Sequence, residues 1–594
     1  MVVARPPQKS LRTCRASCGT PRRKPLPLGE GGWAKGPRLV THNAQGERVD
    51  SVEYHPDYLL MEKMVYEGGV LAIKYDPGFL ANHRRRRHQV GFGAGYYFCQ
   101  TEIGLFCPIA MTDGVGRVLE KHGRGEVARQ TIAHLATRNR EDLWQGAMFL
   151  TERQGGSDVG TNEVVARKQG KRWLLSGDKW FCSNVDAEAI LALARMPAGP
   201  PGTRGLGLFL VLRHRPEHNG STIRIHRLKQ KLGVRSMPTG EVTLENTEGF
   251  LIGGVGRGFK QMAEMLNHSR LFTALGSISA IRRALLEALA YGRERRAFGK
   301  TLWRQPLWRS GMADLMAEQL GALALTFQAV RALDRADCGD AEAASLARLM
   351  IPMAKAVTGK LGVFCVSEAM EAIGGNAYIE ESIMPRLLRD VQVLPIWEGT
   401  TNILALDAQR AVQKERSHEA LFARAAAALA GAREVANDLA AGCDAVEKRL
   451  QDTADHLRNL SAQPPEARQR GSREWLEKAA RALTLALLLE MAGHQPLRPP
   501  RHRGLSPPRG PPPPHHAPFH RRPDRAGGDR RDAPAGGVSA RLAGHGPAAA
   551  AAAENPAQPR FFPLFLPESY SVSLKVKFVA TVCFEVKFNL TQTR

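Results

Sequence analysis

The strongest constraint on the fold is a change of hydrophobic period in the middle of the chain. Residues 148–255 hold short runs of alternating apolar and polar residues separated by turn signals, such as Gly170 between two candidate strands. On both sides apolar residues recur at helical spacing, most clearly over 259–293. We therefore expect an α+β protein in which a small antiparallel β-barrel or sandwich separates an N-terminal helical domain from a C-terminal helical bundle.

The same patterns set the expected domain limits. We expect an N-terminal helical domain, a middle β domain, a helical bundle and an additional helical region at 41–147, 148–255, 256–416 and 417–492. Residues 1–40 form a basic leader, and 493–594 are rich in Pro, Arg and Ala, so neither is expected to order a core. We interpret both as unstructured and non-native, the second through a shifted reading frame, which leaves the first domain incomplete. A transit peptide is the weaker interpretation of the leader, because its prolines disfavour an amphipathic helix.

The net charge of +25 is concentrated at the two ends of the chain. Residues 1–40 carry +8 and residues 491–594 carry +9, which leaves +8 for the 450 residues between them. Bulk charge therefore gives only weak support for nucleic-acid binding. The basic tract 83–88 is more simply interpreted as a solvated face or a local sequence error than as a binding patch.

Cysteine usage and hydropathy exclude several classes of protein. The nine cysteines form no CxxC pair, so a disulfide framework and a zinc site are not expected, and we expect reduced thiols in the cytoplasm. No run of about 18 apolar residues is present, so we expect no membrane span.

Two clusters of polar residues lie within the β block. Residues 148–158 end in a Gly-Gly-Ser-Asp turn, whose N–H groups and hydroxyl suit a phosphate or the polar edge of a flat ring. Residues 177–184 place aromatic side chains and a hydroxyl at a strand end, where they could wall one face of such a ring. Singly, each is more often an ordinary polar turn or core strand.

Two further clusters lie at the ends of long helices. Residues 293–300, followed by Gln305, hold several arginines that could clamp a pyrophosphate, although cations at a helix C-terminus also answer the helix dipole. Residues 371–378 contain paired glycines, which commonly cap helices and also let a backbone approach an adenine or ribose closely.

The fifth cluster, 395–402, contains the candidate base Glu398. This glutamate follows two apolar residues and precedes a helix that Thr400 or Thr401 can cap. Burial among apolar groups raises the pKa of a carboxyl, so Glu398 is a usable base near neutral pH. The simpler interpretation is a glutamate that favours a helix N-terminus.

Together, the order and spacing of the five clusters resemble the acyl-CoA dehydrogenase family. The series reads Thr-Glu-x-x-Gly-Gly-Ser-Asp, Lys-x-Phe-x-Ser-Asn, Arg-x-x-Phe-Gly, Gly-Gly-Asn and Glu-Gly-Thr, within residues 41–490. Residues 106–112 and 229–236 are further similar to the AidB branch, the adaptive-response relatives of that family. Two departures stand out, since Ala297 replaces a common hydroxyl residue and Glu371 replaces a common glutamine.

The resemblance implies an FAD site between the β domain and the bundle, completed by a neighbouring subunit. The residues implied to bind the cofactor are Phe149, Leu150, Thr151, Gly156, Ser157, Phe181, Ser183, Arg295, Phe298, Gln305, Glu371, Gly374, Gly375, Thr400 and Asn402. Ser157 and Arg270 are also implied to contact the substrate, and no metal is implied.

The function implied is that of an FAD-dependent acyl-CoA dehydrogenase, an oxidoreductase acting on CH–CH groups. Glu398 would remove the α-proton of an acyl-CoA thioester while the β-hydride passes to flavin N5. Electrons would leave to an electron-transfer flavoprotein or another acceptor, and the protein would form a homotetramer or homodimer. The alternative is an AidB-like flavin-containing protein that binds double-stranded DNA in the alkylation response, with little dehydrogenase turnover.

Overall fold

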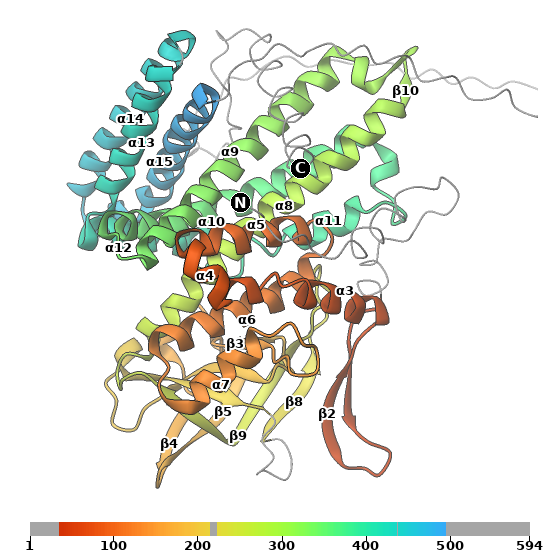
Figure 1. The fold of residues 1–594 in the computed structure, drawn as a ribbon, viewed down its shortest axis with the longest axis vertical. Helices are drawn as coiled ribbons and strands as arrows, with labels where there is room; N and C mark the ends of the chain where they lie inside the picture. The colour runs from red at the N-terminus through yellow and green to blue at the C-terminus, as the bar shows by residue number, and fades with distance from the viewer. Residues whose placement is uncertain (1–34, 214–221, 436, 495–594) are drawn as a thin grey trace, which may run out of the picture. The chain divides into compact units, whose positions relative to one another are not determined.

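The computed structural model describes residues 35–213, 222–435 and 437–494 of the 594-residue chain (Figure 1). The predicted leader up to residue 34 and the predicted tail from residue 495 lie outside the described residues. Within the described part, helices precede and follow a single larger sheet, as the change of period predicts.

The N-terminal domain is mostly helical and opens with a short hairpin. The hairpin strands are β1 (Arg38–His42) and β2 (Arg48–Glu53). They are followed by α3 (Pro56–Glu67), α4 (Pro77–His83), α5 (Arg87–Cys99), α6 (Ile103–His122) and α7 (Gly125–Leu135), with 3-10 turns η1 (Ala72–Lys74) and η2 (Arg84–Arg86). Nearly every residue of α6 is buried, which makes it the central helix of this domain. Helical spacing predicts helices at 111–122 and 126–139, and both are present. Helix α6 begins earlier than Met111 and continues through Pro108, and α7 ends at Leu135.

The β domain is a small barrel. Its strands are β3 (Gly146–Phe149), β4 (Val165–Gln169), β5 (Arg172–Ser183), β6 (Ala189–Arg195), β7 (Leu206–Leu212), β8 (Ile223–Leu228) and β9 (Thr239–Ile252). The pairings β4–β5, β5–β9, β9–β7, β7–β6 and β6–β4 close a ring, while β3 adds to β6 and β8 adds to β9. The predicted β4–β5 hairpin is confirmed, with Gly170 at φ +60° in its turn.

One feature of the barrel departs from the antiparallel prediction. Strand β3, which the periodicity does not reveal, runs parallel to β6, and the short β4–β6 pairing is parallel as well. The reason is that β3 enters from the helical domain, so no hairpin joins it to the strand beside it.

Strands β6 and β7 join the barrel to the helices. On β6, Ile190, Ala192 and Ala194 face the barrel core, whereas Leu191 and Leu193 belong to the larger core of the helical domains. Because both faces are covered, these strands read as continuous apolar runs in the sequence.

The C-terminal bundle is built on three long helices. These are α8 (Gly258–Glu294), α9 (Pro306–Asp337) and α10 (Ala341–Ile373), followed by the shorter α11 (Met384–Val391) and α12 (Thr401–Glu415). A two-residue ladder of β10 (Arg296–Ala297) and β11 (Lys300–Thr301) follows the end of α8. Helix α10 is long and apolar enough to cross a membrane, but most of its apolar stretch is buried, and it packs against α8, α9 and α12.

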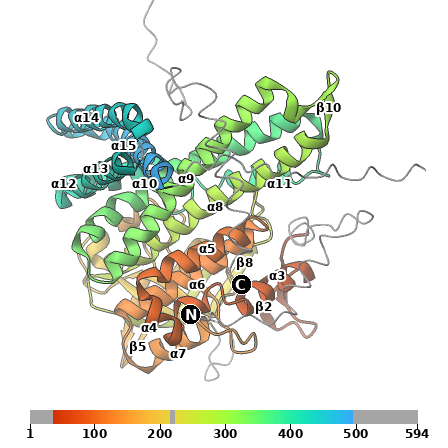
Figure 2. The ribbon, with the colours of Figure 1, turned by 45° about the horizontal axis from the view of Figure 1, so that its top comes forward.

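Three further helices pack beside this bundle. They are α13 (Ser417–Val435), α14 (Ala440–Ser461) and α15 (Pro465–His494), gathered on one side of the molecule in Figure 2. Helical spacing predicts a pair of helices over 417–490, so that prediction is wrong in number. No glycine or proline lies between Val435 and Ala440 to mark the division of α13 from α14.

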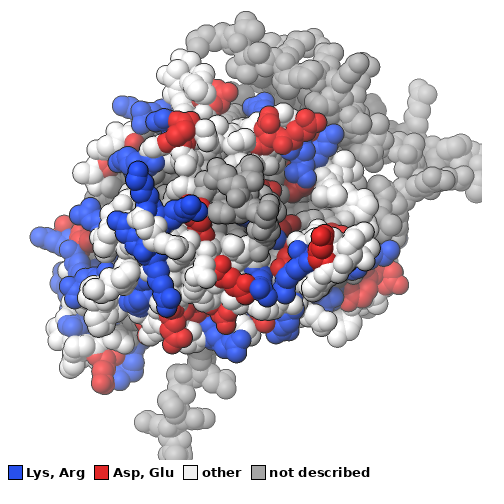
Figure 3. Space-filling view, turned by 90° about the horizontal axis from the view of Figure 1, so that it is seen from below, with Lys and Arg blue, Asp and Glu red and all other residues white. Residues whose placement is uncertain are grey.

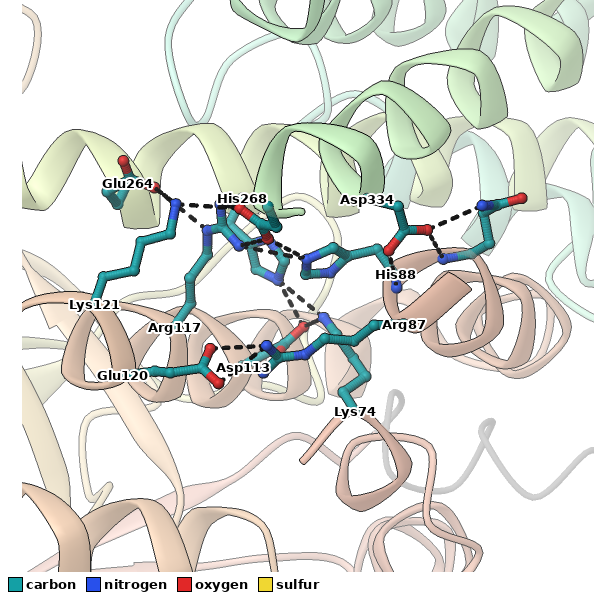
Figure 4. A network of polar contacts seen from close by, with 12 residues as sticks. Lys74, Arg87, His88, Asp113, Arg117, Glu120, Lys121, Glu264, His268 and Asp334 are labelled. Atoms are coloured by element: carbon teal, nitrogen blue, oxygen red, sulfur yellow. Dashed lines mark hydrogen bonds and ion pairs between the residues drawn. The ribbon is translucent and has the colours of Figure 1, made fainter. Parts of the chain in front are cut away.

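A buried polar network ties the N-terminal helices to α8 (Figure 4). The His268 Nε2 atom on α8 lies 2.7 Å from Asp113 Oδ2 on α6 and 3.1 Å from Lys74 Nζ in η1. Lys74 also pairs with Asp113, and its ammonium lies 5.0 Å from the ring centroid of Phe92. All three charged or polar side chains are almost completely buried.

The same network continues to α9. Arg117 on α6 donates to both carboxylate oxygens of Asp337, at 2.6 and 3.0 Å, and His88 Nε2 lies 2.8 Å from the same carboxylate. Asp334 accepts the backbone N–H groups of His88 and Gln89 at 2.7 and 3.0 Å, which satisfies the first turn of α5. The network thereby fixes α8 and α9 against the N-terminal domain.

Candidate functional site

Glu398 lies in a loop between α11 and α12, at a tight turn of unusual backbone conformation. Its φ is +58°, and that of Gly399 is +102°. A positive φ at a non-glycine residue costs free energy and persists only where neighbouring groups hold the backbone in place. Such strained residues are common at functional sites. Two buried cations supply this support: Arg270 Nε on α8 donates to the Glu398 carbonyl at 3.1 Å, and Lys355 Nζ on α10 donates to the Gly399 carbonyl at 2.5 Å.

The Glu398 carboxyl has one oxygen without a partner. Oε2 is buried and accepts no hydrogen bond within the described residues, whereas the Ser269 hydroxyl bonds to the carboxyl group. Burial raises the pKa of Glu398, and Ser269, Arg270 and Lys355 oppose that shift. The arrangement therefore suits a proton acceptor near neutral pH.

Other polar atoms of this loop are also buried without partners in the described part of the chain. They are Trp397 Nε1 and Thr401 Oγ1. The expected capping role of the threonines is wrong, because Thr400 occupies the N-cap of α12 without a capping side-chain bond and the Thr401 hydroxyl bonds to nothing. Buried polar atoms in native proteins are normally paired, so a group of orphans indicates where a ligand would supply partners.

The two clusters of the β domain meet at one edge of the barrel. Trp180 N donates to the Thr151 carbonyl at 2.9 Å, and Lys179 Nζ donates to Glu152 Oε1 at 2.6 Å. Glu152 is itself buried and also accepts backbone N–H groups that follow it, so it anchors the loop rather than facing a ligand. A side chain at Gly156 would approach Thr151 Oγ1 to 2.6 Å, which explains the glycine in this turn.

The side chains of these clusters divide into buried and exposed. Phe149 and Leu150 are buried, so only their backbone can face a ligand, whereas Ser157 is exposed. Phe181 is 55% exposed. The Ser183 hydroxyl lies 3.3 Å from that of Thr239.

Cations that the motifs do not reveal flank the aromatic residues at this edge. Lys229 Nζ lies 3.6 Å from the Trp180 ring centroid and 4.5 Å from that of Phe181. Arg153 lies 5.0 Å from the Trp180 ring. The sequence gives no local signal for this contact, because Lys229 is 48 positions from Phe181.

The third and fourth clusters meet at the far end of the bundle. Trp308 Nε1 donates to the Ala372 carbonyl at 2.9 Å, and Asn376 Nδ2 donates to Tyr291 Oη at 3.0 Å. These contacts bring together exposed residues from both clusters, namely Arg295, Phe298, Glu371, Gly374 and Gly375. Phe298 is 96% exposed, and Gln305 Nε2 donates to the Ala297 carbonyl at 2.9 Å.

The structure does not bring all five clusters together within one chain. Gly258, at the start of α8, packs against Gly207 of the barrel, while the third cluster follows the end of the same helix. A helix of 37 residues is about 55 Å long, so the two ends are far apart. Thr400 and Asn402 are exposed at the start of α12.

Arg270 is engaged by the protein itself. Besides the Glu398 carbonyl, its guanidinium donates to Asn267 Oδ1 at 2.9 Å and to Asp407 Oδ2 at 2.6 Å. Sequence reasoning missed Asp407 and Lys355. Lys355 had a visible signal, because it is one of two lysines, with Lys360, in an apolar stretch of helical period.

Comparisons with known protein families cover most of the described chain. The acyl-CoA dehydrogenase C-terminal domain matches residues 256–413, and the acyl-CoA dehydrogenase middle domain matches 147–247. The adaptive response protein AidB N-terminal domain matches 8–142, a match that begins inside the predicted leader.

Individual proteins agree with these matches. The chain is 36% identical over 396 residues to acyl-CoA dehydrogenase family member 11 of Caenorhabditis elegans, covering 64% of this chain and 63% of that protein. It is 35% identical over 400 residues to the putative acyl-CoA dehydrogenase AidB of Escherichia coli K12, covering 66% and 72% of the two chains.

A solved structure supports the same assignment. The crystal structure of Caenorhabditis elegans ACDH-11 in complex with C11-CoA matches with a TM-score of 0.75 and 32% identity, over 79% of this chain and 81% of that one. The fold, the order of the domains and the N-terminal match all agree with the resemblance found in the sequence. The chain therefore belongs to the acyl-CoA dehydrogenase family, with an AidB-type N-terminal domain.

Proposed function

We propose that the protein is an FAD-dependent acyl-CoA dehydrogenase in which Glu398 removes the α-proton of an acyl-CoA thioester. The observation that carries this proposal is the buried, unpartnered Oε2 atom of Glu398, in a turn that two cations support. Burial raises the pKa of this carboxyl, which brings the base closer to neutral pH.

The residues present fit an FAD molecule. The exposed ring of Phe181, the tight turn at Gly156 and the orphaned polar atoms beside Glu398 offer an aromatic wall, backbone donors and unpaired hydrogen-bonding groups. We assign the isoalloxazine surroundings to the backbone of Phe149 and Leu150 and to Thr151, Gly156, Ser157, Phe181 and Ser183. When bound, FAD would accept the β-hydrogen with its electron pair.

The remaining predicted cofactor residues suit a second copy of the chain. Arg295, Phe298 and Gln305 lie at the far end of α8, with Glu371, Gly374 and Gly375 beside them, so we assign them to the FAD of a neighbouring subunit. Thr400 and Asn402 would complete the site at the start of α12. A homodimer or homotetramer follows from this assignment, as does a near-fully exposed Phe298 in the single chain.

The chain's own groups would carry out the proton transfer. The Glu398 carboxylate would take the α-proton onto Oε2, while its backbone N–H would donate to the thioester carbonyl as negative charge develops there. Ser157 and Arg270 stay predicted substrate contacts. An electron-transfer flavoprotein or another acceptor would receive the electrons, and we place the protein in the cytoplasm because the six cysteines of the described residues are free.

Anaerobic titration with acyl-CoA thioesters tests this proposal directly. The flavin absorbance of the full-length protein should bleach with at least one short, branched or long acyl-CoA, and the Glu398→Gln variant should keep its flavin without bleaching. The proposal fails if the flavin-loaded protein bleaches with none of the three classes.

A second candidate function is binding of double-stranded DNA in the alkylation response, with little dehydrogenase turnover. Figure 3 views the molecule from below and shows Lys and Arg side chains gathered toward one side of this face, with acidic side chains between them. On the β4–β5 hairpin four cations are exposed, and no ion pair is found for them in the described structure: Arg167, Lys168, Lys171 and Arg172. Arg433, in contrast, is engaged with Asp444 and Glu447.

The salt dependence of DNA affinity separates this candidate from an effect of the tails. In a protein lacking 1–34 and 495–594, changing all four hairpin cations to glutamine should reduce the slope of log affinity against log salt by about 3.6 if each contacts a phosphate. Loss of all binding on removal of the two basic tails would assign the binding to their charge and refute the candidate.

A further inference from the structure

We propose that Lys355 is a positioning residue whose ammonium holds the Glu398–Gly399 turn and supplies the counter-charge that keeps the Glu398 carboxylate ionised. This inference rests on the proposed role of Glu398 as a base. It concerns a residue outside the five motif clusters, on the buried face of α10.

Close packing of α10 against the Glu398 loop carries the first step. Lys355 is 0% exposed and donates to the Gly399 carbonyl. One turn later, a side chain at Gly359 would lie 3.2 Å from the Leu394 carbonyl oxygen, so the glycine lets the helix approach the loop. Lys355 therefore contacts the loop from α10, at the turn that orients the Glu398 carboxyl.

The second step is the difference between the two cations of the turn. Arg270 has a carboxylate partner in Asp407, at 2.6 Å, and Asp407 also pairs with Arg348 at 2.8 Å. Lys355 makes no ion pair of that kind with any residue of the described structure. A buried ammonium without a counter-ion is costly, so the carboxylate that balances Lys355 is Glu398 itself.

The titration behaviour of the pair agrees with this assignment. Burial lowers the pKa of Lys355 to about 7, and the negative charge of Glu398 opposes that shift. In return, Lys355 and Arg270 oppose the rise in the pKa of Glu398 that burial causes. Removal of the lysine charge should therefore raise the pKa of Glu398 further and reduce the ionised fraction at neutral pH.

The groups facing the pair come from three helices. Ser269 and Arg270 approach Glu398 from α8, and Lys360 on α10 acts on Lys355. Cys107 on α6 feels the charge of Glu398, and burial raises the pKa of its thiol to about 12, so it stays neutral in the relevant range. Beyond Cys107 lies Lys231, whose pKa burial lowers to about 8, whereas Lys355 acts on Glu398 directly and has its own pKa at about 7.

The test follows the Glu398 carboxyl by infrared difference spectroscopy of the full-length protein as purified, titrated without substrate. The carboxylic acid band that disappears in Glu398→Gln identifies the group. Lys355→Gln keeps a donor for the Gly399 carbonyl but loses the charge, and it should move the midpoint of this band upward by at least one pH unit, a tenfold change. In Lys355→Arg the midpoint should return to within about 0.3 pH unit of that of the unsubstituted protein. In the matched control Lys360→Gln the midpoint should also stay within about 0.3 pH unit of that value.

Two outcomes would overturn the proposal. One is a midpoint that moves less than about 0.3 unit in Lys355→Gln; the other is an equal shift in Lys360→Gln. Circular dichroism of each variant tests folding. If Lys355→Gln does not fold, Lys355→Arg tests the proposal instead. A Glu398 carboxyl that is no longer ionised at neutral pH in Lys355→Arg, which keeps the positive charge, would contradict the assignment. Because no substrate is present, the infrared titration tests the role of Lys355 independently of flavin bleaching by acyl-CoA, which tests the proposed function.

Discussion

Two neighbouring regions of the molecule bury charged groups in different ways. His268 and Arg270 lie two residues apart on α8, one in the network with Lys74 and Asp113, the other at the Glu398 turn. In the network Lys74 meets Asp113 and Arg117 meets Asp337. Asp334 accepts backbone N–H groups instead, and the Nδ1 atoms of His88 and His268 have no partner in the described structure. At the turn, Glu398 Oε2 and two neighbouring polar atoms meet no partner in the described structure. The paired charges of the network hold the helices together, whereas the three unpaired polar atoms gathered at the turn are where we expect a ligand.

The largest expected effect is on chemistry, with little change in folding. Glu398→Gln should slow flavin reduction by acyl-CoA about 10³-fold or more, because the proposed general base is lost. Its midpoint in chemical denaturation should stay equal or rise, since a buried carboxyl with an unpaired oxygen is removed. Stopped-flow absorbance measures the first quantity. The exposed Glu368→Gln on α10 is the matched control, and a Glu398→Gln enzyme with the parental rate would contradict the comparison.

The opposite pattern is expected for the network. Asp113→Asn should cost about 3–5 kcal/mol of folding free energy, because Lys74 is left as an uncompensated buried charge. The shift of the denaturation midpoint measures this cost, with Glu126→Gln, which breaks an exposed pair with Arg129, as a control near zero. A cost under about 1 kcal/mol would show that the network is not what secures α8.

Acid should act on the network in a defined direction. Burial lowers the pKa of His268 from 6.5 to about 4 and also lowers that of His88. Although burial alone would raise it, Lys74 and His268 hold the pKa of Asp113 well below its ordinary value. The unfolded chain therefore binds protons before the folded one does, so stability is lost as pH falls from about 6.5 to about 4, and further loss follows below that.

The contribution of His268 alone is on the order of 3 kcal/mol over this range. Denaturation midpoints between pH 7.5 and 4.5 measure it, and His268→Gln should flatten the profile. A parental protein whose stability stays constant down to pH 4.5 would be inconsistent with neutral buried histidines.

The smallest effect separates a satisfied hydroxyl from an orphaned one. Thr112 Oγ1 donates to the Pro108 carbonyl at 2.7 Å and accepts from Gly146 N at 2.9 Å, so Thr112→Val should cost about 1–3 kcal/mol. Thr401→Val should stay within about 0.5 kcal/mol, because its hydroxyl has no partner to lose. Equal costs for the two substitutions, measured by denaturation, would remove the distinction between the regions.

The parts of the fold that the sequence predicts are those with local patterns. Periodicity predicts a helix over 341–373 and a strand over 189–195, and α10 and β6 have these bounds, because a long apolar repeat and flanking turn residues mark both ends. Strand β3 escapes prediction because its four residues pair with a strand about 40 positions away. The network escapes for the same reason, since Asp113 and His268 are 155 residues apart and neither lies in a recognisable motif.

The candidate site also has a part that local motifs predict and a part that depends on how the helices pack. Ordered motifs locate Glu398, Phe181 and the glycine turns, because each motif is a contiguous string of residues. The partners of Glu398 come from α8 and α10, and their proximity depends on how the helices pack. Lys355 is the instructive case, since a lysine in an apolar stretch of a helix indicates a buried charge without saying which carboxylate lies near it.

The uninterrupted length of α8 has a consequence for how the chain tolerates insertions. One rod bears the barrel contact at Gly258, the support of Glu398 at Arg270, and the segment leading to Phe298. Deleting one residue between Arg270 and Phe298 would turn everything beyond it by about 100° and shorten the rod by about 1.5 Å. A change of seven residues, two turns, would keep the faces within about 20° of alignment. The length of α8 therefore sets the distance and orientation between these contacts. We expect insertions and deletions to be tolerated in exposed turns such as 43–47 instead.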